Sequence, residues 1–344
     1  SLTAGAVLTR RLPAPHSAES GLTWSTAGAT RVIFGVLGIL ILGASGAAAL
    51  LAGRTRDFAS VADETTGWIE FPPEVMQNWP SFRGPGSSGT GYPGTAPVAW
   101  DGADGTNILW KSPVPLGGLS SPVVWGDSVF LTGAEAGLQE VYCWDTETGS
   151  PRWTAEVGPF PGSPAELPDL SLGAGYAAPS PATDGSRVYV IFAGGDLACL
   201  DFDGNLVWGS NVGYVDDPYG HSSSLLIFEE LLIVQYDHGE SAFVAAFDLQ
   251  SGGQVWKTAR EVYDTWSSPT LVQFDSEWQL VINASPFAAA YDPRTGEELW
   301  RIEDILGEVA SSPGYSDGRV IIINQLMSIL SVDAGNGEIE WELY

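Results

Sequence analysis

A short phrase that recurs along the chain constrains its fold more than any other feature. The phrase reads Asp-x-x-x-Gly-x-x-x-Trp, and one copy is a residue shorter. Its copies start and end at Asp145 and Trp153, Asp201 and Trp208, Asp248 and Trp256, Asp292 and Trp300, and Asp333 and Trp341. Trp110 ends a degenerate first copy, and from it the Trp spacings are 43, 55, 48, 44 and 41 residues. A period of about 40 to 50 residues is typical of propeller blades.

A second phrase lies between the Trp residues and keeps the same phase. It is Ser-Pro at four places, replaced by Ser224-Leu225 at a fifth; the four serines are Ser121, Ser180, Ser268 and Ser312. An apolar run of β-forming residues follows most copies, and Asp then Gly between such runs is typical of a hairpin turn. A four-stranded unit of this size cannot bury both faces alone, so the units must stack. The sequence therefore predicts an all-β propeller of four-stranded blades, with about six units, over residues 79–344.

Two physical details complete this prediction. A Trp at one fixed position per unit can wedge between neighbouring sheets and bury a large apolar area. Two residues before the Asp of each phrase the side chain is always small; these residues are Cys143, Cys199, Ala246, Ala290 and Ser331. We therefore expect one packing site per blade, with the two cysteines too far apart to form a disulfide.

The charge balance excludes one class of partner. The chain has 42 acidic and 14 basic residues and a formal net charge of −28. Nucleic acid binding needs a basic surface, so no nucleic acid partner is expected. Residues 1–56 hold five Arg and one Glu, a net charge of +4, which leaves −32 on the remainder. Any protein surface that meets this acidic part is expected to be neutral or basic.

An apolar segment near the N-terminus predicts a membrane anchor. Residues 32–53 carry no charge, and about 20 apolar residues cross a bilayer, so we predict a transmembrane helix at 31–53. A cleaved signal peptide is the alternative, but the 31-residue lead is long for one. Arginines on the N-terminal side favour a cytoplasmic N-terminus. Residues 1–30 are expected to be a flexible tail and residues 54–78 a linker.

Small residues follow one face of this predicted helix at a spacing of four. They are Gly43, Ala44, Ala47 and Ala48. Small-xxx-small spacing lets membrane helices approach closely, which predicts a packing face for another membrane subunit. A high content of Gly and Ala in membrane helices is the simpler explanation.

The repeats resemble those of the quinoprotein-type, PQQ-binding-like β-propeller family, whose members include BamB-like proteins. The stretch Trp79-Pro-Ser-Phe-Arg-Gly-Pro85 is similar to the N-terminal signature of the membrane-anchored members. The resemblance implies seven or eight blades, so we expect the natural chain to continue past Tyr344. It covers residues 79–344 and predicts the fold much more specifically than the function.

The catalytic residues of the family do not transfer to this chain. Its alcohol dehydrogenases hold PQQ over a Trp, coordinate Ca²⁺ with Glu and Asn, and use an Asp base, often beneath a vicinal disulfide. No set of residues here matches that pocket, so we assign no catalytic, cofactor or metal residues. His221 and His238 lie in one unit with Asp217 and Asp237, where a metal site or solvated turns are both possible.

These observations favour a non-catalytic protein. We expect a single-pass protein of the bacterial inner (cytoplasmic) membrane, with its propeller in the periplasm, that serves as a scaffold or accessory subunit of a membrane complex. Its partners would be membrane lipid and other membrane-protein subunits. The alternative function is a PQQ-dependent, membrane-bound quinoprotein oxidoreductase.

Overall fold

The computed structural model describes residues 69, 71–91, 99–167, 170, 175–214, 217, 219–324 and 328–343. The chain divides into a unit at Ser1–Thr65 and a unit at Thr66–Tyr344, and all described residues belong to the second. The predicted tail, the predicted helix at 31–53 and its small residues lie outside the described residues. Within the described part, no helix is long and apolar enough to span a bilayer.

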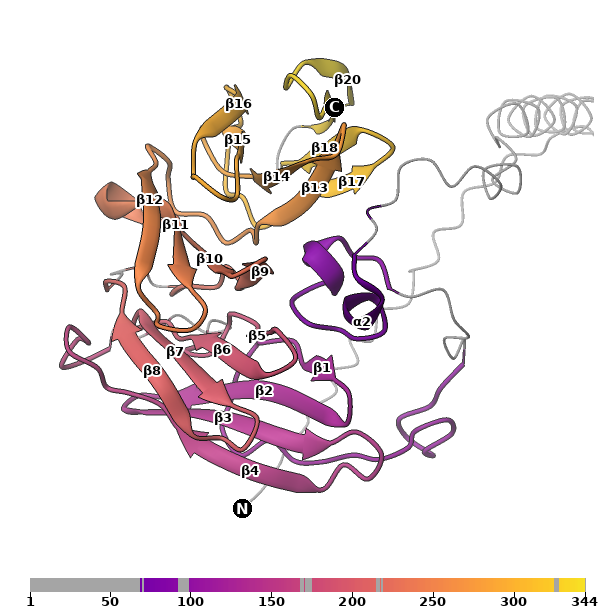
Figure 1. Ribbon diagram of the computed structural model, residues 1–344, viewed down its shortest axis with the longest axis vertical. Coiled ribbons are helices and arrows are strands. Elements are labelled where there is room, and N and C mark those ends of the chain that lie inside the picture. The colour runs from indigo at the N-terminus through magenta and orange to yellow at the C-terminus, as the bar shows by residue number, and fades with distance from the viewer. Residues whose placement is uncertain are drawn as a thin grey trace, which may run out of the picture. The chain divides into compact units, whose positions relative to one another are not determined.

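The described residues form five four-stranded antiparallel sheets, each with its strands in chain order (Figure 1). Sheet 1 holds β1 (Val123–Trp125), β2 (Ser128–Glu135), β3 (Leu138–Asp145) and β4 (Pro151–Glu156). Sheet 2 holds β5 (Ala182–Thr183), β6 (Arg187–Ile191), β7 (Asp196–Asp201) and β8 (Leu206–Asn211). Sheet 3 holds β9 (Leu226–Phe228), β10 (Leu231–Tyr236), β11 (Phe243–Asp248) and β12 (Gln254–Ala259). Sheet 4 holds β13 (Thr270–Phe274), β14 (Glu277–Ile282), β15 (Ala288–Tyr291) and β16 (Glu298–Ile302), and sheet 5 holds β17 (Gly314–Ser316), β18 (Arg319–Ile323), β19 (Ile329–Asp333) and β20 (Ile339–Leu343).

This architecture confirms the predicted all-β fold and corrects the number of units. About six units were expected, but the described residues contain five sheets, and residues 99–122 form no strand. Pro113 and Pro115 follow Trp110 closely, and proline cannot donate to a strand ladder. Trp110 nevertheless keeps the contact typical of the repeat, because its Nε1 donates to the carbonyl oxygen of Thr146, 2.8 Å away.

The apolar core lies between the sheets. Each pair of successive sheets shares one cluster of buried side chains, from sheets 1 and 2 to sheets 4 and 5. Between sheets 2 and 3, for example, Tyr189 and Leu197 pack with Leu232 and Val234. Burial between neighbours explains why a single unit of this sequence would not be stable alone.

Each Trp of the repeat from Trp110 to Trp300 crosses to the turn of the sheet that follows it. Its Nε1 donates to a turn carbonyl at 2.8–3.2 Å; the acceptors are Thr146, Phe202, Leu249, Pro293 and Ala334. The glycine of that turn has φ between +66° and +85°, and a Cβ on it would lie only 2.4–3.0 Å from the Trp. Glycine is therefore needed both for the turn conformation and for the space that the indole occupies.

The small residue before each Asp lies directly opposite a Trp in the strand ladder. Cys143 pairs with Trp153 and Cys199 with Trp208, and the later units repeat this register. A register shift follows every one of these pairs. Both cysteines are buried free thiols. The position is small because an indole stands beside it on the neighbouring strand.

The serines of the second phrase lie just before the first strand of each sheet, here called its inner strand, and hydrogen bonds connect them. The fourth strand of each sheet is its outer strand. The backbone N–H of one serine donates to the hydroxyl oxygen of the serine in the next sheet, at 2.8–3.1 Å. The series runs through Ser121, Ser180, Ser224, Ser268 and Ser312. Its position before each inner strand explains why the phrase keeps phase with the Trp repeat.

Candidate functional site

Residues 71–91, here called the central segment, lie among the innermost strands of the sheets. The segment contains helix α2 (Pro73–Met76) and the 3₁₀ turn η2 (Pro85–Ser87). Figure 1 shows it in indigo and purple between β1, β9 and β13, and η2 contacts both β9 and β13. The central segment therefore packs against the first strands of several sheets.

Three sheets hold the central segment by hydrogen bonds. Trp79 and Val124 exchange two backbone hydrogen bonds of 2.8 and 2.9 Å, and the Thr183 N–H donates to Pro80 at 2.8 Å. The guanidinium of Arg83 donates to the carbonyl oxygen of Pro313, 2.8 Å away. The signature Trp79–Pro85 therefore binds sheets 1, 2 and 5 to one another.

Two glycines let the central segment fold compactly. Gly84 and Gly86 have φ of +79° and +59°. A Cβ on Gly84 would lie 2.9 Å from the Trp79 ring, and one on Gly86 would lie 2.3 Å from the Phe71 ring. Both aromatic rings thus pack on bare backbone.

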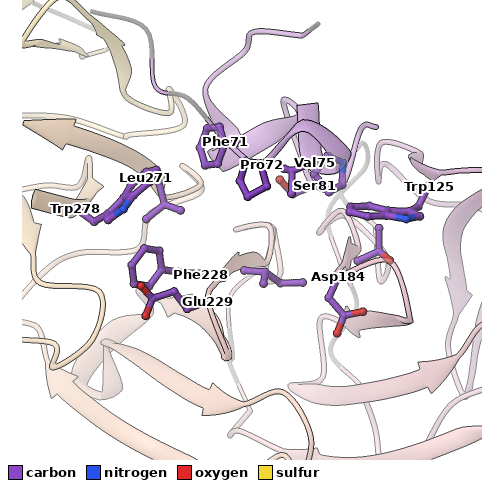
Figure 2. Close-up of a pocket in the computed structure, with 13 residues that line it drawn as sticks. Phe71, Pro72, Val75, Ser81, Trp125, Asp184, Phe228, Glu229, Leu271 and Trp278 are labelled. Carbon is purple, nitrogen blue, oxygen red and sulfur yellow. The ribbon is translucent and has the colours of Figure 1, made fainter. Parts of the chain in front are cut away.

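A pocket of about 360 Å³ lies between the central segment and the inner strands (Figure 2). Its lining is mostly apolar and comprises Phe71, Pro72, Val75, Pro80, Ser81, Trp125, Thr183, Asp184, Ile227, Phe228, Glu229, Leu271 and Trp278. Phe71 and Phe228 both pack against Trp278, with ring centroids 5.4 and 5.7 Å from it. Glu229 and Asp184 lie on the side opposite the central segment (Figure 2).

Neither carboxylate in this lining is free for chemistry. Glu229 pairs with Arg294 at 2.7 Å, and Asp184 accepts hydrogen bonds from the Tyr189 hydroxyl and from turn amides. The lining residues include no His, Cys, Lys or Arg. PQQ is a polycarboxylate whose negative charge needs cationic partners, and these lining residues offer none, so they do not fit it. The pocket suits an apolar group of a ligand or partner.

The Asp residues of the repeat are occupied in turns on the surface. Asp145 forms an ion pair with Arg152 at 2.6 Å and accepts hydrogen bonds from Thr148, and together these contacts lower its pKa to about 2. Asp201 and Asp248 likewise accept turn amides, and hydrogen bonds lower the pKa of both. The carboxylates of Asp292 and Asp333 accept the N–H of the residue two positions on. These five residues shape turns in the described part of the chain.

His221 and His238 are both buried, so their interpretation as solvated turn residues is wrong. His221 is 0% exposed and His238 is 5% exposed. Folding places His238 beside Asp217 and Asp264, and His221 contacts His238 on its other ring nitrogen. Asp264 was not identified from the sequence, whereas Asp237, which was, forms an ion pair with Arg260 instead. Asp264 lies in the link between β12 and β13, outside the repeated phrases, so no pattern in the sequence predicts its contact with His238.

One face of the molecule carries exposed apolar side chains on its connections. Strands alternate in direction, so every link from an outer strand to the next inner strand emerges on the same face, opposite the Asp–Gly turns. We call this the connection face. Large apolar residues on it are 50–69% exposed: Leu119, Tyr219, Tyr263 and Leu306. Exposed apolar side chains on adjacent links can contribute to a protein-binding surface.

Comparison with known proteins identifies relatives of this fold. A family model described as outer membrane protein assembly factor BamB matches residues 90–217 and 240–344. The structure of BamB from Moraxella catarrhalis is 19% identical, with a TM-score of 0.51 over 70% of this chain and 68% of that chain. No curated protein has a sequence that matches this chain.

Two dehydrogenases also share the fold. The quinohemoprotein alcohol dehydrogenase from Comamonas testosteroni is 14% identical, with a TM-score of 0.54 over 78% of this chain and 49% of that chain. A europium-containing methanol dehydrogenase is 13% identical, with a TM-score of 0.52 over 66% of this chain and 51% of that chain. The chain thus spans about half the length of each enzyme, and identities this low show a common fold alone.

Proposed function

This chain belongs to the BamB-like family of PQQ-type β-propeller repeat proteins, and we propose that it is a non-catalytic scaffold or accessory subunit of a membrane complex. The observation that carries the proposal is the connection face, where the exposed side chains of Tyr263 and Leu306 stand on successive links. Burial of such side chains against a partner supplies the main driving force for association.

The chemistry of the pocket supports the same function. A catalytic site needs a nucleophile or base in reach of substrate, and the only carboxylates in the lining, Asp184 and Glu229, already have partners. An apolar pocket with a few acidic groups at its edge suits a side chain of a bound protein. The formal charge of −28 favours a partner with a neutral or basic surface.

We place the protein at the bacterial inner membrane, anchored by residues 31–53, with the propeller in the periplasm. Support comes from the uncharged stretch and from the arginines that precede it. Gly43, Ala44, Ala47 and Ala48 would pack against a helix of another subunit. An Ala47→Leu variant should leave the propeller folded and weaken association with that subunit.

Purification from its source membrane in mild detergent tests the scaffold. We expect stoichiometric membrane subunits to co-purify with the wild type and to be lost from a Tyr263→Ser/Leu306→Ser variant. The matched control is Leu206→Ser/Leu299→Ser, which removes two exposed apolar side chains from outer strands and should keep the partners. If both variants keep the partners, the connection face is not the binding surface.

An activity assay distinguishes the alternative. A PQQ-dependent oxidoreductase would reduce a dye in the presence of an alcohol or a sugar, and the rate would depend on added PQQ and Ca²⁺. We expect no such rate from the purified chain. A cofactor-dependent rate would overturn the non-catalytic assignment.

A further inference from the structure

Three loops of the connection face bring two carboxylates and an imidazole together. Asp217 comes from the β8–β9 link, His238 from the β10–β11 loop and Asp264 from the β12–β13 link. His238 Nδ1 lies 3.7 Å from Asp217 Oδ2 and 3.8 Å from Asp264 Oδ1. The three potential ligand atoms all lie within 4.8 Å of one another. We propose that these residues bind a divalent transition-metal ion, with Zn²⁺ favoured.

The protein leaves the key atoms of this cluster without partners. Asp217 is 3% and His238 5% exposed, yet Asp217 Oδ2 and His238 Nδ1 have no hydrogen-bond partner. Separations of 3.7 and 3.8 Å are too long for hydrogen bonds between them. Burial of unsatisfied polar atoms is costly, and a cation bound by all three side chains removes that cost.

The spacing suits a metal ion. With metal–ligand bonds of about 2.1 Å, neighbouring ligands of a tetrahedral zinc site lie about 3.4 Å apart. The two distances from His238 Nδ1, 3.7 and 3.8 Å, exceed that value by only a few tenths of an ångström. Asp264 has 46% of its side chain exposed, so an ion and a water ligand can reach the site from solvent.

Neighbouring groups hold the ligands in position. His238 Nε2 lies 3.0 Å from His221 Nδ1, so one ring nitrogen of His238 is occupied while Nδ1 faces the carboxylates. Such an outer hydrogen bond is typical of a metal-binding histidine. The backbone N–H groups of Tyr219 and Gly239 donate to Asp217 Oδ1 and Asp264 Oδ1, each at 2.8 Å.

Charge and donor type select the ion. Two carboxylates and a neutral imidazole carry a charge of −2, which matches a divalent cation. The positive charge of Arg260, on the same link as Asp264, is balanced by Asp237 at 2.7 Å, so it does not oppose the ion. A mixture of nitrogen and oxygen donors is typical of zinc sites, whereas Ca²⁺ and Mg²⁺ take oxygen ligands.

The site has a structural consequence. Its three ligands belong to the links around sheet 3 and to the loop between its second and third strands. A bound ion would therefore connect sheets 2, 3 and 4 across the connection face. Metal binding to the folded state stabilises it by mass action, so Zn²⁺ should raise the midpoint of thermal unfolding.

Calorimetric titration of the full chain in detergent, after removal of metal with EDTA, tests the proposal. We expect one Zn²⁺ per chain, with Kd raised at least about 100-fold in His238→Gln and in Asp217→Asn. The matched control is Asp275→Asn, which changes an exposed turn carboxylate and should bind as the wild type. Visible absorption bands of bound Co²⁺ should disappear in His238→Gln and persist in the control.

Several outcomes would overturn the assignment. These are no binding of Zn²⁺ to the wild type, unchanged binding by Asp217→Asn, or tighter binding of Ca²⁺ than of Zn²⁺. If the buried substitutions prevent folding, Asp264→Asn provides the decisive variant, because its partly exposed side chain can change without disturbing the core. If folded Asp264→Asn bound Zn²⁺ with the affinity of the wild type, the proposed site would be wrong.

Discussion

The indole of Trp208 lies over Gly252, and its Nε1 donates to the carbonyl oxygen of Leu249, 3.0 Å away, in the turn of the next sheet. Trp110, Trp153, Trp256 and Trp300 repeat this relationship with the sheets that follow them. The Gly of one phrase thus makes room for the Trp of the phrase before it. Each phrase up to the one that ends at Trp300 therefore takes part in two contacts between sheets: its Gly packs against the preceding Trp, and its Trp packs against the following Gly.

Substitution of Gly252 by alanine tests this contact. The Cβ would lie 2.6 Å from the Trp208 ring, at a φ of +70°. A left-handed conformation costs a non-glycine residue about 1–2 kcal/mol, and overpacking costs about 1–3 kcal/mol, so Gly252→Ala should lose about 2–5 kcal/mol. Urea unfolding, followed by Trp fluorescence, measures the loss.

Gly253 is the matched control, because it is the next residue and lacks both constraints. An added Cβ there would meet only the Ser251 hydroxyl, at 3.3 Å, and its φ lies outside the left-handed region. We expect Gly253→Ala to change the free energy of unfolding by less than about 1 kcal/mol. Equal losses at the two glycines would mean that the indole contact does not determine the stability.

The sequence predicted this fold well because its signals are local. The Asp and Gly of a turn and the Trp of the following strand lie within nine residues, so one phrase encodes a hairpin and its packing residue. The serine phrase added a second register. The number of sheets was harder to predict, because Trp110 keeps its hydrogen bond to Thr146 although no strand forms around it.

The candidate sites depend on contacts that are distant in sequence. Residues 71–78 had the composition of a linker, yet Phe71 packs on Trp278, more than 200 residues away, and helps to line the pocket. Asp264 joins His238 only because both loops emerge on the connection face. Neither contact follows from periodicity, because the period of the repeat predicts the positions of the strands and does not predict the conformation of the long links between sheets.

Comparison of Trp300 with Trp341 tests the repeat itself. Trp300 is 7% exposed and its Nε1 donates to Ala334, whereas Trp341 is 43% exposed. Trp300→Ala should lose about 3–5 kcal/mol, as core aromatic truncations do. Trp341→Ala should lose clearly less, because it removes less buried area. Thermal unfolding measures both, and similar midpoints for the two variants would contradict the packing explanation.

Removal of one hydroxyl from the serine series measures how much one of its hydrogen bonds contributes to the free energy of unfolding. Ser224 Oγ accepts the backbone N–H of Ser180 at 3.1 Å, and both residues are buried. Ser224→Ala leaves that N–H unsatisfied, which should cost about 1–3 kcal/mol. Ser222→Ala serves as the control, because its hydroxyl makes only a 3.5 Å contact with Trp266. A loss in the control as large as in Ser224→Ala would rule out the series as the cause.

The carboxyl of Asp145 should remain ionised in unusually acidic solution. Arg152 and the turn amides lower its pKa to about 2, so its contribution to stability is present above the unfolded value of about 3.9 and is lost as pH falls through 2. Carboxyl ¹³C NMR at pH 3 should find Asp145 ionised in the wild type. In Arg152→Gln its pKa should rise toward the ordinary value.

The control for this titration is Arg294→Gln, which removes a different surface guanidinium, the partner of Glu229. It should leave the pKa of Asp145 unchanged. If Arg152→Gln also leaves it unchanged, the turn amides alone would account for the low pKa, and the ion pair at 2.6 Å would contribute nothing to it.

The ion pair of Arg260 and Asp237 gives the sharpest test of the interior. Nε and Oδ1 are 2.7 Å apart, and both side chains are fully buried. Removal of one partner from a buried pair leaves an uncompensated charge, so Asp237→Leu or Arg260→Met should each lose about 3–5 kcal/mol. The double variant should lose less than either single one, because apolar residues of similar size replace both charges.

A double-mutant cycle by urea unfolding measures this coupling directly, with the exposed pair of Arg319 and Glu340 as a matched comparison. Those side chains are 46% and 31% exposed, and exposed pairs contribute about 0–1 kcal/mol. The buried pair should therefore show a coupling energy several times larger. Equal coupling energies would mean that water reaches Arg260 and Asp237, and that this part of the interior between sheets 3 and 4 opens in solution.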